Sequence, residues 1–92
     1  EADNAWLVRC SILSALAEQP EIDLQWLMEL AIIAITDADG TVRVSGAEIL
    51  SRVVRDGASL PVGAQARALL QPLQQDADHR VVAAALNGLQ SA

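Results

Sequence analysis

The sequence has no phenylalanine, no tyrosine and no lysine, and it has one cysteine among 92 residues. Its aromatic fraction of 2% consists of Trp6 and Trp26. Runs of β-branched and aromatic residues, which are typical of sheets, are therefore missing. Alanine and leucine instead dominate a hydrophobic fraction of 52%, and both residues favour helices. The composition predicts an all-α protein whose helices pack closely through small side chains.

Charge and apolar run lengths exclude two classes of partner. The net charge of −6 would repel a phosphate backbone, so we expect no nucleic-acid partner. The longest apolar stretch, residues 24–35, is too short and too polar to span a bilayer, so we expect no membrane insertion. Cys10 alone excludes an intrachain disulfide, and we expect a cytoplasmic protein. Because the chain begins with Glu1 and not Met, we also expect it to be a piece of a longer protein.

The chain repeats itself. Asp37-Ala38-Asp39 returns 39 residues later as Asp76-Ala77-Asp78, and an apolar helical pattern follows each copy. An earlier copy lacks the aspartates but keeps the helical pattern, 34 residues upstream. In that copy, Val8, Arg9, Ile12, Ala15 and Leu16 align with Val42, Arg43, Gly46, Ile49 and Leu50. A period of this size built from paired helices is typical of an α-solenoid.

The pattern predicts a single domain over residues 1–92 with five antiparallel helices, an α-α superhelix of two full repeats and a preceding half repeat. The helices are expected at about residues 5–18, 24–35, 41–55, 61–75 and 79–90. The second helix is apolar nearly all round, so we expect it to be covered on more than one side. In the last helix we expect Gly88 to lower the stability by about 1 kcal/mol relative to alanine.

Four residues are predicted to begin or end helices. Asp39 and Asp78 precede the third and fifth helices, where a carboxylate accepts backbone N–H groups. We expect Asp23 to cap the second helix in the same way. Gly57 follows the third helix, and we expect it to stop that helix in a left-handed conformation.

An apolar helix followed by this repeated pattern resembles the HEAT repeat, and the resemblance covers the whole chain. The matching residues are Asp39, Val42, Arg43, Gly46 and Leu50. In that family the Val-Arg helix is the second of each pair. The resemblance therefore implies that residues 24–35 and 41–55 form one repeat and residues 61–75 and 79–90 another. The helix over residues 5–18 would be the second half of a preceding repeat.

The same resemblance implies an Asp–Arg ladder that links successive repeats. Its members would be Arg9, Asp39, Arg43 and Asp78. The ladder is incomplete, since Val82 stands at the arginine position of the last unit and Ala5 at the aspartate position of the first.

A finer resemblance concerns the run Trp6-Leu7-Val8-Arg9, followed one repeat later by Gly40-Thr41-Val42-Arg43. These runs are similar to the cyanobacterial HEAT-like proteins grouped with phycobilin lyases. Members of that group attach, isomerise or help to remove bilins on phycobiliproteins. The resemblance implies a phycobilin ligand and a phycobiliprotein partner of the phycobilisome.

The acidic segment also invites comparison with a calcium-binding EF-hand loop. Residues acceptable to that pattern stand at loop positions 1, 3, 5, 8 and 12, which are Asp37, Asp39, Thr41, Val44 and Glu48. Position 6, however, is Val42 where the turn requires glycine. Helix capping explains both copies of the segment, so we expect no metal site.

No residue pattern indicates an active site. His79 is the single histidine, and no second histidine or cysteine stands near it to form a zinc site. The sequence has no glycine-rich phosphate loop, Gly-x-Ser-x-Gly elbow or His-Glu-x-x-His motif. We therefore expect no catalytic residue and, under this interpretation, no cofactor.

The candidate partner-binding residues are Trp6, Arg9, Arg43 and Arg52. An exposed Trp6 beside Arg9 would anchor a protein or a flat tetrapyrrole, whereas the alternative for Trp6 is core packing. For Trp26 we expect core packing. Arg9 and Arg43 lie near helix starts, where their forks suit carboxylates, and Arg52 lies on the outer side of its helix as a solvated charge.

Three functions stay open. The first is a non-enzymatic scaffold that binds another protein through its helical surface. The alternative is a phycobilin lyase-like protein that handles chromophores on phycobiliproteins. The third is self-association through exposed solenoid ends, because the first helix lacks a partner on one side.

Overall fold

The computed structural model describes residues 5–19 and 23–90, which form five helices and no strand. The helices are α1 (Ala5–Ala17), α2 (Leu24–Ile35), α3 (Gly40–Asp56), α4 (Pro61–Leu73) and α5 (His79–Gln90). The predicted all-α, helical-repeat-like fold is confirmed. The predicted helix ends agree with these bounds to within two residues.

The largest difference concerns the end of α4, which was expected near Gln75. The helix ends at Leu73, directly after Pro72. Proline has no N–H to donate to the carbonyl one turn earlier, and its ring crowds that carbonyl, so the last turn of α4 is weakened. At the other end, Pro61 occupies the first turn, where a missing N–H costs nothing.

The aspartate caps are confirmed at all three predicted positions. The carboxylate of Asp23 accepts the N–H of Gln25 at 2.9 Å, and that of Asp39 accepts the N–H of Thr41 at 2.8 Å. Asp78 accepts the N–H of Arg80 at 2.9 Å. Each bond satisfies a backbone donor that has no partner inside the helix.

The expected left-handed stop at Gly57 is wrong. Gly57 does end α3, and its N–H donates to the carbonyl of Val53 at 2.8 Å, but its φ is −109°. The reason for glycine is close packing. A side chain on the neighbouring Gly63 would place its Cβ 2.7 Å from the carbonyl carbon of Gly57. The two glycines therefore let the start of α4 lie directly against the end of α3.

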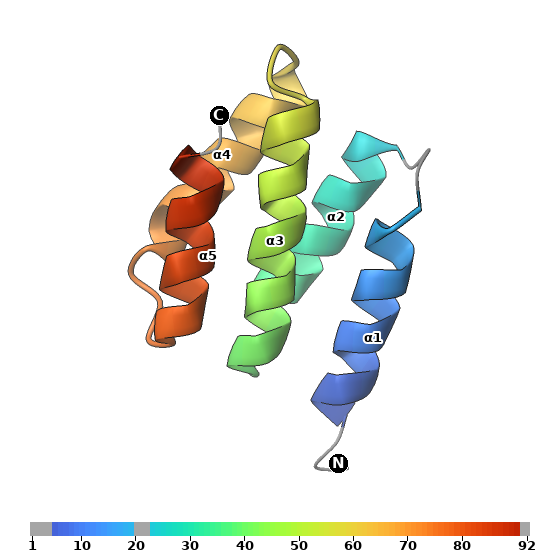
Figure 1. Ribbon diagram of the computed structural model, residues 1–92, viewed down its shortest axis with the longest axis vertical. Coiled ribbons are helices and arrows are strands. Elements are labelled where there is room, and N and C mark those ends of the chain that lie inside the picture. The colour runs from blue at the N-terminus through green and yellow to red at the C-terminus, as the bar shows by residue number, and fades with distance from the viewer. Residues whose placement is uncertain (1–4, 20–22, 91–92) are drawn as a thin grey trace.

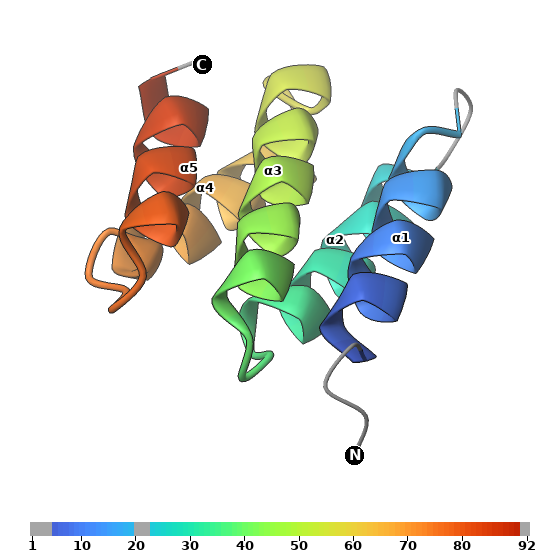
Figure 2. The ribbon, with the colours of Figure 1, turned by 60° about the horizontal axis from the view of Figure 1, so that its bottom comes forward.

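The helices form two layers (Figure 1). α1, α3 and α5 lie side by side in one layer, and α2 and α4 cover them from behind. α3 is central, since it packs against each of the other four helices. The second view shows the same order along the stack, with α1 and α5 at opposite ends (Figure 2).

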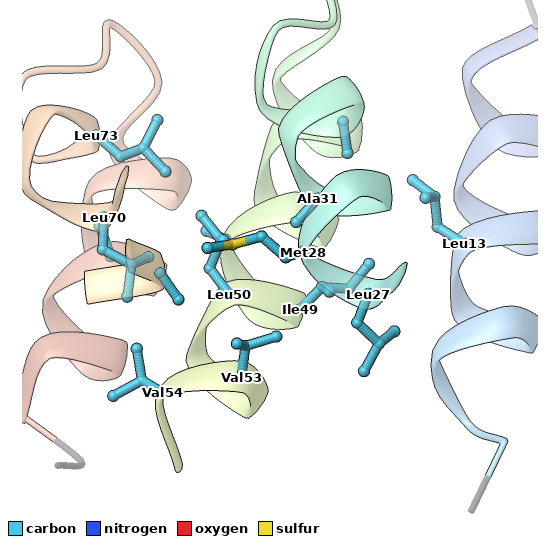
Figure 3. Packing of buried hydrophobic residues seen from close by; sticks show 14 of the residues in the cluster. Leu13, Leu27, Met28, Ala31, Ile49, Leu50, Val53, Val54, Leu70 and Leu73 are labelled. Atoms are coloured by element: carbon cyan, nitrogen blue, oxygen red, sulfur yellow. The ribbon is translucent and has the colours of Figure 1, made fainter. Parts of the chain in front are cut away.

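The hydrophobic core runs through the middle of these layers (Figure 3). α3 supplies its centre with Ile49, Leu50, Val53 and Val54, and these side chains meet residues of α2 and α4. α1 contributes a single buried side chain among the described residues, Leu13. The first helix is therefore attached to the core less extensively than the other four.

The expectation for Trp26 is wrong, and of the two alternatives left open for Trp6 the structure favours core packing. Trp26, expected in the core, is exposed, whereas Trp6 is half-buried and packs against the core. The expected covering of α2 on several sides is also wrong, because Ile32 and Ile33 are exposed. α2 is buried on the side that faces α3, and its outer side has no neighbour among the described residues.

Gly88 lies at a close contact between helices. Its Cα lies in the contact between α5 and α3, where an added Cβ would clash with Ser51 and stand 2.9 Å from Leu70 Cδ1. Packing and helix propensity therefore act in opposite directions at this position. The disadvantage of about 1 kcal/mol for glycine relative to alanine stays a prediction, and the close packing at Gly88 opposes it.

Candidate protein-binding face

Two arginine–aspartate pairs link successive units of the stack. Arg9 of α1 binds Asp37 in the loop before α3, with Nε 2.7 Å from Oδ2 and Nη2 3.0 Å from Oδ1. Arg43 of α3 binds Asp76 in the loop before α5, at 2.9 Å and 3.1 Å. Such two-point contacts fix both the distance and the orientation of the partners. They therefore set how each unit lies on the one before it.

The predicted arginine–aspartate ladder is thus present, but the aspartates that form it are not the predicted ones. Asp39 and Asp78 cap helices, and the residues two positions earlier, Asp37 and Asp76, bind the arginines. Asp37 also accepts the N–H of Asp39 at 2.8 Å. This local bond holds the carboxylate toward the preceding unit, whereas the capping carboxylate is turned toward its own helix. The carboxylate of Asp76 likewise accepts the N–H of Asp78, and this bond holds it toward the preceding unit.

The pairing lowers the carboxyl pKa values. The pKa of Asp37 lies below its usual value, chiefly because the N–H of Asp39 and then Arg9 stabilise the charged form. The pKa of Asp76 is lowered chiefly by the side-chain bonds from Arg43. Arg80 lowers the pKa of Asp78 to about 2. All three carboxylates are therefore charged at neutral pH.

Arg43 and Arg52 also bind backbone carbonyls. Arg43 Nη1 donates to the carbonyls of Asp37 and Ala38, both at 2.9 Å. Arg52 donates to the carbonyls of Ala17 and Gln19 at the end of α1, so its expected role as a solvated charge is wrong. A cation at a helix C-terminus satisfies orphan carbonyls and complements the helix dipole.

The described structure therefore does not bring the candidate binding residues together into one exposed site. Arg9, Arg43 and Arg52 take part in contacts between elements, and the ring of Trp6 is half-buried. Their partner-binding role stays a prediction. Exposed apolar side chains gather instead at other positions of α1 and α2.

We call these residues the α1/α2 face: Val8 and Ile12 of α1, and Trp26 and Ile33 of α2. Their exposed fractions are 58%, 53%, 42% and 71%, respectively. Val8 and Ile12 lie one turn apart on α1, and Trp26 and Ile33 lie two turns apart on one side of α2. The four side chains form two exposed apolar stripes, one on each helix.

The stripes meet at an open pocket of about 170 Å³ between α1 and α2. Ile12 and Ile33 line it from the two helices, and Val42 lines its floor. The Arg9–Asp37 pair forms the polar part of the wall. An apolar hollow bordered by a fixed ion pair suits an apolar side chain that has a polar group beside it.

The repeat explains why these residues are apolar. Val8, Ile12 and Ala15 align with Val42, Gly46 and Ile49 of α3, all of which are buried. At Gly46 the buried surface is against Ala34 and Ile35 of α2. In α1 the same positions have no covering helix among the described residues. The α1/α2 face is therefore a repeat-packing surface that lacks its neighbour.

A second hollow, of about 430 Å³, lies beside α4 and is lined by Val54, Ala64 and Arg67 among others. Arg67 extends from it to the carbonyl of Leu89, at 3.3 Å. It has no second polar side chain that could orient a ligand among its lining residues. This hollow is therefore a weaker candidate than the α1/α2 face.

The described residues do not assemble a catalytic or metal-binding group. None of their histidine, cysteine and carboxylate side chains form a set of three or more that could hold a metal ion. His79 is exposed at the start of α5, and Cys10 lies half-buried with its sulfur 3.7 Å from Ser45 Oγ. Within residues 5–19 and 23–90, every helix is too short or too polar to cross a lipid bilayer.

Comparison of the chain with protein-family models, with curated proteins and with solved structures found no match. Sequence reasoning missed Ile12 and Ile33 as exposed residues. The available signal was the alignment of Ile12 with Gly46, a position that α2 covers on α3 and that no described helix covers on α1.

Proposed function

We propose that this chain is a HEAT-like helical-repeat scaffold that binds another protein and catalyses no reaction. One observation carries the proposal, which is the exposure in α1 of repeat positions that α3 buries. Large apolar side chains exposed on two helices beside one apolar pocket are typical of a protein interface. The ladder supports the same role, since it holds the two stripes of the face in a fixed relation.

Site-specific photo-crosslinking tests this proposal. A benzophenone amino acid would replace Ile33 in the α1/α2 face or Gln65 on the exposed side of α4, and each variant would be irradiated in extract of the source cells. We expect a discrete protein adduct from position 33 and none from position 65. Equal labelling from both positions, or no protein adduct from either, would contradict the proposal.

The phycobilin lyase-like interpretation stays a prediction, and a titration separates it from the scaffold. Free phycocyanobilin would be added to the purified chain and its visible absorbance followed. The scaffold proposal predicts a flat titration. A saturable red shift that weakens in Trp6→Ala or Arg43→Ala would favour chromophore handling instead.

A further inference from the structure

From the α1/α2 face we propose the chemistry of the partner, an inference that rests on the proposed protein-binding function. We infer that the face binds a basic amphipathic helix that covers α1 as α2 covers α3. This helix carries small residues where it crosses Ile12. Separate observations support the helical form, the small residues and the positive charge of this partner.

The helical form follows from the repeat. On α3, the aligned positions Val42, Gly46 and Ile49 are buried, and the atoms nearest to Gly46 belong to α2. The chain thus contains one filled example of the same packing surface. Because helix faces with matching ridges and grooves accept the same kind of neighbour, a helix is the occupant that fits.

The small residues follow from a difference between the two surfaces. In α3 the crossing point is Gly46, which lets Ala34 and Ile35 approach so closely that any Cβ there would stand 2.8 Å from Ile35 Cγ2. In α1 that position is Ile12, a large side chain. A helix that approaches α1 equally closely must therefore have alanine or glycine opposite Ile12, because core-like packing leaves no room for two large side chains.

The positive charge follows from the surroundings of the face. The described residues up to residue 39 carry five carboxylate side chains and one arginine, whereas residues 40–90 carry four carboxylates and five arginines. That one arginine, Arg9, is already bound to Asp37. Glu29 is exposed within one turn of both Trp26 and Ile33, and Glu18 and Asp23 are exposed at the nearby helix ends. A partner with Lys or Arg beside its apolar stripe is therefore favoured.

The same charges disfavour a second copy of this chain as the occupant. Two α1/α2 faces brought together would place Glu29 and Asp23 of both copies in one interface, where like charges cost free energy. Docking of the other end is no better, because α5 has Val82 at the arginine position and so has no guanidinium for a following aspartate. Self-association is therefore disfavoured, and it is the main alternative to binding of a partner helix.

The test uses two labelled peptides of about 18 residues, long enough for several helical turns. Both carry the stripe that α2 presents to α3, with the spacing of Leu27, Met28, Ala31 and Ala34. Lysine and arginine fill the remaining positions in one peptide, and glutamate fills them in the other. Fluorescence anisotropy would measure binding to the full chain and to Ile12→Gln, Ile33→Gln and Leu86→Gln, and sedimentation velocity would measure the size of the free chain.

We expect the basic peptide to bind, and the acidic peptide to bind at least about tenfold more weakly. Ile12→Gln and Ile33→Gln should each weaken the basic peptide about tenfold, whereas Leu86→Gln on α5 should change it less than about twofold. Replacing the two alanines of the basic peptide by leucine should also weaken it. Circular dichroism would establish that each variant is folded.

Three results would overturn the inference. Equal binding of both peptides, with loss in Ile12→Gln, would retain an apolar docking face but reject a basic partner. A dimer that Ile12→Gln dissociates would identify a second copy as the occupant. No binding of either peptide to a monomeric chain would reject the helix, while the crosslinking at position 33 decides separately whether the face binds a protein at all.

Discussion

At the amino-terminal end of the stack, α1 and α2 expose six large hydrophobic side chains, whereas α5 at the other end exposes only Leu86 among the described residues. The charges differ in the same direction, because the excess of carboxylates lies in residues 1–39. The ends differ even though α1 and α5 carry copies of the same repeat pattern. One end has the character of an internal packing surface, and the other has the character of a cap.

The comparison shows that a residue's place in the repeat does not decide its burial. Leu16 of α1 aligns with Leu50 of α3, yet Leu16 is half-exposed and Leu50 is fully buried. The difference lies in the covering helix. α3 is covered at this position, whereas α1 has no covering helix there in the described structure. Stability should therefore depend on the central helices, and binding on the first two.

The largest expected effect is a difference in stability between alanine substitutions at the two aligned leucines. Leu50→Ala should lower the free energy of unfolding by about 3 kcal/mol, because it leaves a cavity at the centre of the core. Leu16→Ala, the matched control, should lower it by less than about 1 kcal/mol. Urea denaturation measures both. Similar losses in the two variants would mean that α1 is packed as fully as α3.

The second effect concerns the close approach of α3 and α4. Gly63→Ala would push a Cβ into the carbonyl group of Gly57 and should destabilise the fold by about 2 kcal/mol. Helix propensity alone predicts the opposite, a gain of about 1 kcal/mol. A denaturation midpoint that rises in this variant would show that the two helices do not approach as closely as described.

The third effect compares the two rungs of the ladder. The Arg43 and Asp76 side chains are 19% and 11% exposed, whereas Arg9 of the outer rung is 38% exposed. Asp76→Ala should therefore cost about 1.5 kcal/mol, because it leaves a mostly buried guanidinium without its carboxylate. Asp37→Ala should cost about 0.5 kcal/mol. Equal losses in urea denaturation would contradict the difference between inner and outer units.

The smallest effect is a dependence of stability on acidic pH. The folded pKa values of Asp37, Asp76 and Asp78 lie below the ordinary value of 3.8, that of Asp78 at about 2. Their contribution is therefore complete above the unfolded pKa and is lost as the pH falls from about 4 toward about 2. Urea midpoints should stay constant from neutral pH to about 5 and fall below about 4, less steeply in Asp76→Asn. A midpoint that rises on acidification would reverse the sign and contradict this account.

The sequence predicted the helices and the caps because both depend on local patterns. Asp39 and Asp78 cap because the N–H groups they need lie two residues away. The ladder partners Asp37 and Asp76 could not be separated from the caps by spacing, since their arginines are 28 and 33 residues distant in sequence. The exposure of Trp26 was also beyond reach, because it depends on which neighbouring helices cover α2. The apolar character of α2 alone does not specify them.

Cysteine labelling at aligned positions tests the central claim most directly. Val8→Cys and Val42→Cys would be made in a Cys10→Ala background, and each thiol would react with iodoacetamide under native conditions. If α1 exposes the surface that α3 buries, the thiol at position 8 should react within about threefold of its rate in the unfolded chain, and the thiol at position 42 at least about a hundredfold more slowly. Equally slow reaction at both positions would show that the α1/α2 face is already covered, and would contradict the account.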